Sequence, residues 1–356
     1  MPKLTLLLTM SLTGPGELNW TPVQDALRLW PSEIAGLPLT ILFHDDKADP
    51  QAAINVAQAA FAESPVDAVI QFALSGPAFA IAQWAADHQV PHFALSPIQG
   101  RPAPWTFRLS APPALMAQGI WDHIRDRGYT RLAYIGTDDN YGNTWRDLMV
   151  KHFNDRGLPL CCDESYLRTD ETTQAQAERI AQAQPEAVII GGPGHTALLP
   201  QTDLRQAGFK GQIYQTFGAA MAVLAEAPPV LTDGTLMVTG PGSVADILPQ
   251  DHGAATVTRD FNARFAQKFG HAHGSQAAIS TCDVLKILEP AVREALLKAE
   301  PGTAAFRLAL RSALEADQPV VTGSGTFNYS PEDHFGIAPD GRVLIELSGG
   351  QWRIAQ

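Results

Sequence analysis

The chain has 356 residues, which is enough for two domains of ordinary size. Apolar residues make up 45% and charged residues 17% of the sequence, a balance typical of a folded, soluble protein. The net charge of −12 argues against nucleic acid and anionic membrane as partners, and no apolar stretch approaches the roughly 20 residues that span a bilayer.

The cysteines and the amino-terminal segment leave the cellular compartment open. Cys161, Cys162 and Cys282 show no C-x-x-C or zinc-binding spacing, so we expect buried free thiols. Met1–Gly14 has one lysine and an apolar core but no clear A-x-A cleavage site. A mature chain whose export signal is replaced by Met1 and a natively cytoplasmic chain would both begin in this way.

The first third of the chain predicts alternating strands and helices, from apolar runs separated by segments of about 10–15 residues. The predicted strands are Leu4–Met10, Leu39–His44, Val66–Phe72 and His92–Leu95. The predicted helices are Pro22–Trp30, Pro50–Glu63 and Pro77–His88. Because this alternation produces βαβ units, we expect a parallel sheet covered by helices.

A proline-rich crossover, Gln99–Pro113, then interrupts the alternation of strands and helices, because proline favours neither a helix interior nor a central strand. The alternation restarts with predicted strands at Leu132–Ile135, Ala187–Ile190, Gln212–Phe217 and Gly234–Thr239. The helices predicted with them are Ala114–Arg127, Asn143–Arg156, Gln174–Gln184 and Thr196–Ala207. The pattern therefore predicts two α/β lobes.

The last third is helical at first and then forms short strands. The predicted helices are Val257–Phe269, Ala277–Ala299 and Thr303–Glu315. The predicted strands are Gly323–Asn328, His334–Ile337, Arg342–Leu347 and Gln351–Ile354. The sequence has no tandem repeat of about 20–50 residues, which excludes solenoid and propeller arrays.

The turn around Tyr141 is the most informative segment. The apolar run Leu132–Ile135 ends in a polar turn, Thr137–Asn140, and Tyr141-Gly142 opens the next helix. In an open α/β sheet, ligands bind beyond the carboxyl ends of the strands. Tyr141 therefore either contacts a ligand or merely packs at a strand–helix turn.

The other motifs do not predict catalysis. Gly191–Gly194 lies between a strand and a helix but does not match G-x-G-x-x-G, and no P-loop lysine follows it. The sequence has no G-x-S-x-G, and Ser75 fits a helix-capping position better than a nucleophile. His44, His271 and His273 lack the ligand set of a metal site. We therefore expect a binding protein without catalytic residues, metal or cofactor.

Five elements, in this order, resemble the branched-chain amino-acid type of solute-binding proteins of ABC transporters, which have the type I periplasmic-binding-protein fold. They are Ser11–Pro15 (SLTGP), Ser96-Pro97, Arg108, the D-x-x-Y-G segment Asp138–Gly142, and the ending from Gly325–Phe327 to Gln351-Trp352. The resemblance covers essentially the whole chain.

The resemblance implies an α/β fold with two doubly wound parallel-sheet lobes joined by three hinge crossovers. Lobe 1 would hold residues 1–112 and 248–322, and lobe 2 would hold residues 113–247 and 323–356. A small molecule would bind in the cleft between the lobes and stabilise a closed form, which the permease of an ABC transporter would then recognise. The resemblance also implies a periplasmic protein that is a monomer or a weak dimer.

The same resemblance implies ligand-binding residues on the strand-end loops. In lobe 1 they are Asn19, Trp20, Phe72, Ala73, Leu74, Ser75, Ser96, Pro97, Ile98 and Gln99. In lobe 2 they are Tyr141, Pro193, Gly194, His195, Phe217 and Gly218. The helix that begins near Pro77 would direct its free backbone N–H groups at the cleft, which favours a carboxylate there.

Two departures from the family pattern bear on the ligand. Where amino-acid binders carry an acid for the ligand ammonium, this chain has Phe217, and a buried ammonium without a counter-charge would cost several kcal/mol. Where they carry a small hydroxyl residue, it has Phe72, and two rings favour a flat apolar ligand. With a misalignment of a residue or two, Asp138, Asp139 or Glu226 would instead supply the charge.

These observations predict a receptor for a small carboxylate or amide with an apolar, aromatic body, rather than a free α-amino acid. Tyr141 and Phe217 would cover the body, while Ser75, Ser96 and nearby backbone N–H groups would hold the polar end. His195 would either add a hydrogen bond or lie on the rim. The alternative is a cytoplasmic sensor of amides or acids with the same fold. A dinucleotide-dependent enzyme is disfavoured, because the glycine fingerprint is missing.

Overall fold

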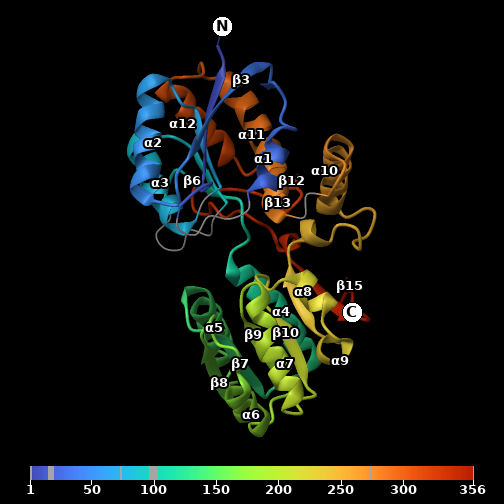
Figure 1. The fold of residues 1–356 in the computed structure, drawn as a ribbon. Coiled ribbons are helices and arrows are strands. Elements are labelled where there is room, and N and C mark those ends of the chain that lie inside the picture. The colour runs from blue at the N-terminus through green and yellow to red at the C-terminus, as the bar shows by residue number, and fades with distance from the viewer. Residues whose placement is uncertain (1, 15–19, 73, 96–102, 273–274, 356) are drawn as a thin grey trace. The chain divides into compact units, whose positions relative to one another are not determined.

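The computed structural model describes residues 2–14, 20–72, 74–95, 103–272 and 275–355. The chain forms two compact α/β units, which confirms the predicted fold class (Figure 1). Unit 1 comprises Met1–Ala111 and Pro241–Gly341, and unit 2 comprises Pro112–Gly240 and Arg342–Gln356. Residues 241–247 and 323–341, expected in the second lobe, thus belong to unit 1, where Phe327 and Tyr329 pack into the core.

Unit 1 contains a six-stranded sheet in the order β2-β3-β1-β4-β5-β6. Its strands are β1 (Leu4–Met10), β2 (Glu33–Ile34), β3 (Leu37–Asp45), β4 (Ala68–Phe72), β5 (His92–Ala94) and β6 (Thr106–Arg108). All neighbouring strands are parallel except β2 and β3. Strand β1 is buried at every residue, because helices cover both faces, and this explains its mostly apolar sequence.

Two of these strands, the edge strands β2 and β6, lie where none was predicted. β6 falls in the proline-rich crossover and pairs with β5 at the edge of the sheet. An edge strand tolerates flanking prolines, because only one of its sides needs backbone hydrogen bonds. The strand is three residues long and contains no proline itself.

Helices cover both faces of the unit 1 sheet (Figure 1). One face is covered by α2 (Pro50–Glu63) and α3 (Ser75–His88), with Trp84 and Ala57 against Leu7 and Val69. The other face packs against α1 (Thr21–Leu27), α11 (Gln276–Leu296) and α12 (Ala304–Leu314). Unit 1 also holds α10 (Gly253–Phe269) and a two-stranded hairpin of β12 (Val320–Thr322) and β13 (Gly325–Phe327).

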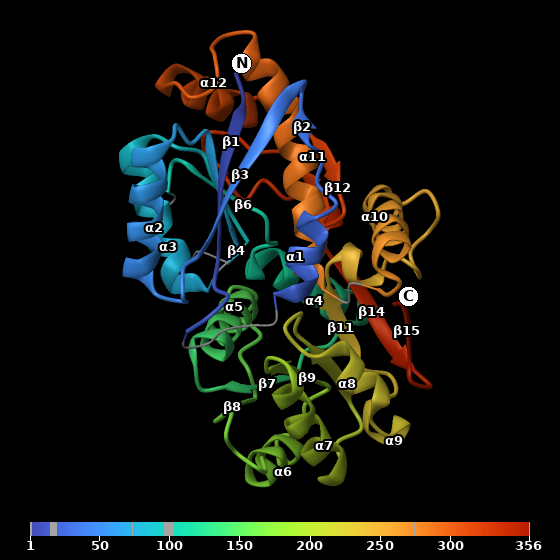
Figure 2. The same cartoon turned by 45° about the horizontal axis from the view of Figure 1, so that its top comes forward.

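Unit 2 contains a seven-stranded sheet in the order β15-β14-β11-β10-β9-β7-β8. Its strands are β7 (Leu132–Thr137), β8 (Cys162–Tyr166), β9 (Ala187–Gly191), β10 (Gln212–Gln215), β11 (Leu236–Thr239), β14 (Val343–Ser348) and β15 (Gln351–Ile354). The strands from β11 to β8 are parallel, whereas β14 and β15 are antiparallel and extend the β11 side (Figure 2).

Strand β8 was not predicted, and His334–Ile337, predicted as a strand, forms only the single bridge Phe327↔Ile337. Polar residues explain the first miss, because β8 is an edge strand in which half-buried and exposed residues alternate before the buried Tyr166. In the second segment, the backbone carbonyl of His334 accepts the N–H of Arg108 at the end of β6, without forming a continuous ladder.

Helices also cover both faces of the unit 2 sheet (Figure 1). One pair is α4 (Pro113–Arg127) and α5 (Asn140–Asn154), and the other is α6 (Gln174–Gln182) and α7 (Leu198–Gln206). Ile180 of α6 and Leu204 of α7 pack against Ile135 and Ile190 of the sheet. The shorter α8 (Met221–Glu226) and α9 (Pro229–Thr232) lie between β10 and β11 in the sequence.

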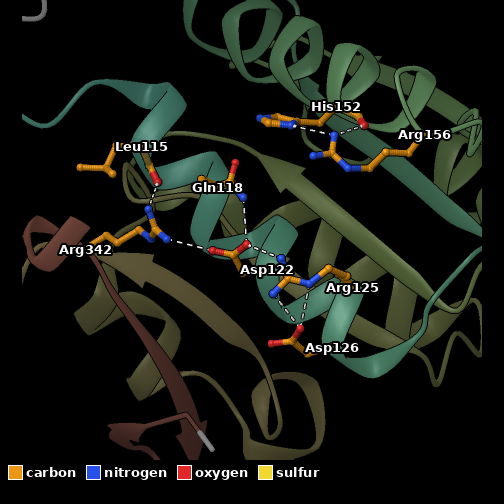
Figure 3. A network of polar contacts seen from close by, with 8 residues as sticks. All are labelled: Leu115, Gln118, Asp122, Arg125, Asp126, His152, Arg156 and Arg342. Carbon is orange, nitrogen blue, oxygen red and sulfur yellow. Dashed lines mark hydrogen bonds and ion pairs between the residues drawn. The ribbon is translucent and has the colours of Figure 1, made fainter. Parts of the chain in front are cut away.

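A polar network ties the two chain segments of unit 2 together. Arg342, where the second segment begins, donates to Oδ2 of Asp122 at 2.9 Å and to the carbonyl of Leu115 at 3.4 Å (Figure 3). Asp122 also accepts from Gln118 and Arg125, so α4 presents one carboxylate to three donors (Figure 3). The returning segment is therefore fixed to α4 beside β14.

Candidate functional site

The turn that carries Tyr141 is built around the carboxylate of Asp139. After β7 ends, Asp139 takes an extended conformation and caps α5, with its Oδ1 accepting the N–H groups of Tyr141 at 2.8 Å and Gly142 at 3.0 Å. Its Oδ2 accepts from Nε of Arg168 at 2.5 Å. Burial alone would raise the pKa of Asp139, but the hydrogen bonds from Arg168 and Gly142 outweigh it and lower the pKa. This carboxylate is therefore charged, and both of its oxygens accept hydrogen bonds.

The hydroxyl of Tyr141 is bound inside unit 2. It lies 2.8 Å from Oγ1 of Thr216 and accepts the backbone N–H of Gly218 at 2.9 Å. Burial raises the pKa of Tyr141 to about 12, although these hydrogen bonds oppose the shift, so the hydroxyl stays protonated at neutral pH. The ring is half-buried. Of the two roles left open by the sequence, the structure shows packing directly, and ligand contact stays a prediction.

Tyr141, Trp145 and Phe217 form an aromatic cluster. The ring centroid of Phe217 lies 6.5 Å from that of Tyr141 and 5.9 Å from that of Trp145. Tyr141 and Trp145 are four residues apart on α5 and so project from the same face of the helix. Trp145 is buried, whereas Phe217 is half-buried. Phe217 is therefore partly accessible beside a buried tryptophan.

The loops after β9 and β10 are joined beside this cluster. Gly194 donates its N–H to the carbonyl of Gly218 at 2.7 Å, and its own carbonyl accepts the N–H of Ala220 at 3.0 Å. Pro193 is half-buried next to Gly194, and His195 is exposed at the start of a short 3₁₀ helix. The structure thus brings together all six residues that the sequence predicted for the second lobe.

Gly218 is a position where only glycine fits without a rearrangement. A Cβ atom at this residue would lie 2.3 Å from the hydroxyl oxygen of Tyr141 and 2.6 Å from Cζ of its ring. Both distances are far below van der Waals contact, so a larger residue would displace either the loop or the ring. The glycine therefore permits the close approach of Tyr141.

The three acidic residues considered as sources of charge in place of Phe217 differ in their surroundings. Asp139 is paired with Arg168 and caps α5. Asp138 and Glu226 are exposed, Glu226 at the last residue of α8. A charge supplied by Asp138 or Glu226 therefore stays the alternative prediction.

In unit 1, two adjacent aspartates hold the turn that follows β1. Ser11 donates its hydroxyl to Oδ1 of Asp46 at 2.7 Å and accepts the N–H of Leu74 at 3.4 Å. Asp45 accepts from the N–H of Leu12 at 2.9 Å and from the hydroxyl of Thr13 at 2.5 Å. Burial raises the pKa of Asp46, although the Ser11 hydroxyl stabilises its charged form. This network fixes the strand-end turn beside the start of α3.

The start of α3 differs from the predicted one. The helix begins at Ser75, which is exposed, and its N-cap is Leu74, which provides no side-chain hydrogen bond. Ser75 is therefore not a capping residue. The N–H groups of the first turn lack a side-chain cap, which is compatible with the predicted binding of a carboxylate.

Two predicted aromatic contacts of unit 1 are corrected by the structure. Phe72 is fully buried and packs in the core with Leu8 and Ile70, so it offers no ring to a ligand. Trp20 is 8% exposed and joins the same core. Both side chains fill space between the sheet and its helices, which a family alignment does not reveal.

The remaining predicted residues of the first lobe lie outside the described residues. They are Asn19, Ala73, Ser96, Pro97, Ile98 and Gln99.

Sequence reasoning missed several residues that build these turns: Asp46, Trp145, Arg168 and Thr216. Trp145 had a signal, because it lies four residues after Tyr141 in a predicted helix. Arg168 had none, because it follows the unpredicted strand β8.

One cavity of unit 1 lies away from these turns. A cavity of about 340 Å³ lies between α11, the end of α12 and the β12–β13 hairpin, with Ile287, Phe327 and Tyr329 in its wall. It contains none of the predicted site residues.

Within the described part of the chain, no group of three or more His, Cys, Asp or Glu side chains could hold a metal ion, and no helix is long and apolar enough to cross a membrane.

Comparison with known proteins agrees with this architecture. A family model described as periplasmic binding protein matches residues 3–343. A search of curated proteins gives no significant match. An extracellular ligand-binding receptor from Rhodopseudomonas palustris is 31% identical, with a TM-score of 0.83 and 99% of each chain covered.

Two further solved structures share the fold at lower identity. A putative branched-chain amino acid ABC transporter protein from Rhodospirillum rubrum is 21% identical, with a TM-score of 0.80 and coverage of 99% of this chain and 100% of that one. A solute-binding protein of an ABC transporter from R. palustris, solved in complex with benzoate, is 19% identical, with a TM-score of 0.70 and coverage of 99% and 95%.

The resemblance inferred from the sequence motifs is thereby confirmed. The family and these neighbours are solute-binding receptors rather than enzymes. With a family model matched over nearly its whole length, this chain belongs to the periplasmic binding protein family.

Proposed function

We propose that this chain is the extracytoplasmic solute-binding receptor of an ABC importer, and that its ligand is a small carboxylate or amide with an apolar, aromatic body. The importer and the periplasmic location follow from the family, whose members capture a solute and present it to a permease. The ligand class follows from the residues at the strand ends.

The observation that carries the ligand class is the aromatic cluster of Tyr141, Trp145 and Phe217. A half-buried ring on a fixed support binds a flat apolar group through buried area and ring stacking. Phe217 brings no charge for an ammonium group, and the carboxylate of Asp139 is already paired with Arg168. Neither residue is therefore available to pair with the ammonium of a zwitterionic amino acid.

Unit 1 by itself offers candidate partners for a carboxylate or amide group. The Ser11–Asp46 network fixes the turn next to α3, and the first N–H groups of α3 have no side-chain cap. Backbone N–H groups at a helix start bind carboxylate or amide oxygens. The benzoate found in the R. palustris neighbour is an acid of the proposed class, although that protein shares only 19% identity.

A thermal-shift experiment tests the ligand class. Benzoate and benzamide should raise the Tm of the wild-type protein, whereas L-leucine and L-valine should not. Phe217→Ala should lose the shift, and Phe269→Ala, which removes a half-buried ring from α10, should retain it. Stabilisation by leucine or valine with benzoate-like acids inert would contradict the proposed ligand class.

The transport role has a separate test. Deleting the gene in the source organism should abolish ATP-dependent uptake of the compound that stabilises the purified protein. Unchanged uptake would contradict the role in import, while leaving the ligand class intact.

A further inference from the structure

We propose that Tyr141 and Thr216 act as positioning residues that fix the ring of Phe217, and that Phe217 makes the receptor selective for a planar aromatic ring over a saturated ring of equal size. This inference rests on the proposed function and specifies the ligand body that the site accepts.

The first step is that the hydroxyl of Tyr141 has partners within the protein. It is 2.8 Å from Oγ1 of Thr216, a fully buried residue, and it accepts the N–H of Gly218 at 2.9 Å. These two residues flank Phe217 in the sequence. One hydroxyl on α5 therefore contacts the side chain of Thr216 on one side of Phe217 and the backbone of Gly218 on the other.

The second step is that most backbone N–H groups of this loop already donate to acceptors within the protein. Thr216 donates its N–H to the carbonyl of Ile190, Ala219 to Thr216, and Ala220 to Gly194. With Gly218 bound to Tyr141, four N–H groups of the segment 216–220 are used internally. The loop therefore presents few backbone donors to a ligand and mainly offers the surface of a ring.

The third step is that the Phe217 ring is supported on two sides. Tyr141 lies at an interplanar angle of 63° to it and Trp145 at 55°. Tilted rings at these separations attract one another through their quadrupoles and hold the middle ring in one orientation. A fixed ring binds a second flat ring without first losing side-chain freedom, which is the general benefit of preorganisation.

A saturated ring would gain less from this arrangement. Benzoate and cyclohexanecarboxylate carry the same carboxylate on a six-membered ring, but only the first is planar and has a π face. Any donors in unit 1 would treat the two carboxylates alike. The ratio of their dissociation constants therefore isolates the contribution of the ring surface in unit 2.

The test uses calorimetry to measure the ratio of the dissociation constants of benzoate and cyclohexanecarboxylate. The proteins compared are wild type, Tyr141→Phe, Thr216→Val, Phe217→Leu and the double variant Tyr141→Phe/Phe217→Leu. Wild type should bind benzoate about threefold to tenfold more tightly than cyclohexanecarboxylate. Phe217→Leu should abolish the preference. Tyr141→Phe and Thr216→Val should each reduce it, and the double variant should match Phe217→Leu, because both changes act through one ring.

Two further measurements separate positioning from a general loss of stability. Tyr129→Phe removes the hydroxyl of a half-buried tyrosine that follows α4 and is not part of the aromatic cluster, and it should keep the wild-type ratio. Amide hydrogen exchange at Gly218 should accelerate in Tyr141→Phe without ligand, because its acceptor is gone.

Several outcomes would overturn the inference. Equal binding of both acids by wild type would remove the selectivity while leaving the proposed function intact. An unchanged ratio in Tyr141→Phe and Thr216→Val would remove the positioning role, and additive losses in the double variant would show that the Tyr141 hydroxyl touches the ligand directly. If neither acid binds to wild type, the proposed ligand class itself fails, and this inference fails with it.

Discussion

The hydroxyl of Tyr141 and Oγ1 of Thr216 lie 2.8 Å apart although the two residues are 75 positions apart in the chain. This contact joins the start of α5 to the end of β10, the two elements that carry the aromatic cluster. The arrangement of the aromatic cluster is therefore set within unit 2, which allows direct tests by substitution.

Removing this hydroxyl should lower stability without unfolding the protein. In Tyr141→Phe, the buried Thr216 hydroxyl and the Gly218 N–H lose a partner, so we expect the free energy of unfolding to fall by about 1–2 kcal/mol. Urea denaturation measures the change. Tyr129→Phe serves as the control and should change stability by less than about 0.5 kcal/mol. Equal effects of the two substitutions would show that the Tyr141 hydroxyl contributes nothing specific.

A methyl group at Gly218 should clash with the same tyrosine. Gly218→Ala places Cβ 2.3 Å from the Tyr141 oxygen, and we expect a loss of about 1–3 kcal/mol. In a Tyr141→Ala background the same substitution should cost much less, because the ring that it strikes is absent. Denaturation of the four proteins gives the coupling energy. A coupling energy near zero would mean that the loop relaxes away from the ring.

Arg342 should contribute more stability than an ordinary surface arginine. Its guanidinium is mostly buried and reaches both Asp122 and the Leu115 carbonyl, thereby fixing the returning segment to α4 (Figure 3). We expect Arg342→Ala to cost about 1–2 kcal/mol of unfolding free energy. Arg353→Ala, which breaks an exposed pair with Glu346, should cost less than about 0.5 kcal/mol. Similar losses from both variants would argue against a special role for the network.

Asp283 should make stability depend on pH. It is fully buried in α11, where its carboxylate accepts the Gly323 N–H at 2.7 Å and the Ser324 hydroxyl at 2.5 Å. Burial raises its pKa from 3.8 to about 6, although these hydrogen bonds oppose the shift. The folded protein therefore holds the proton more tightly than the unfolded chain does.

The sign of this effect follows from proton linkage. The contribution of Asp283 is fully present below about pH 4 and is lost as the pH rises through about 6, with a total on the order of 3 kcal/mol. Asp283→Asn should lack this decline when urea denaturation is measured across that range. Asp260→Asn, at an exposed site on α10, should keep the wild-type profile. A decline that survives in Asp283→Asn would assign it to another group.

The regular part of the fold was predictable because burial acts on local sequence. β1 and β9 are apolar runs that helices cover on both faces, and the turn at Tyr141 has a capping aspartate next to a helix start. The edge strands β6 and β8 were missed for the opposite reason, since partly exposed strands carry prolines or polar residues without a distinct pattern.

The candidate site was predictable only in part. Motif order placed Tyr141, Gly194, Phe217 and Gly218 on strand-end loops, and the structure brings these loops together in unit 2. Phe72, which was also predicted for the site, instead lies in the core of unit 1, where its ring is fully buried. Whether a strand-end side chain points inward or outward depends on the packing of its neighbours, which motif spacing does not contain.

By itself, the sequence determined the α/β class, the order of most elements and the family, because hydrophobic periodicity and short turn motifs are local properties. Only the tertiary structure decided that Asp139 is paired with Arg168, that Tyr141 binds Thr216 and Gly218, and that Phe217 rests against Trp145. These contacts join residues from different elements, and their geometry is set by how the helices and loops pack on the sheet. Which side chains remain accessible to a ligand is therefore a result of folding.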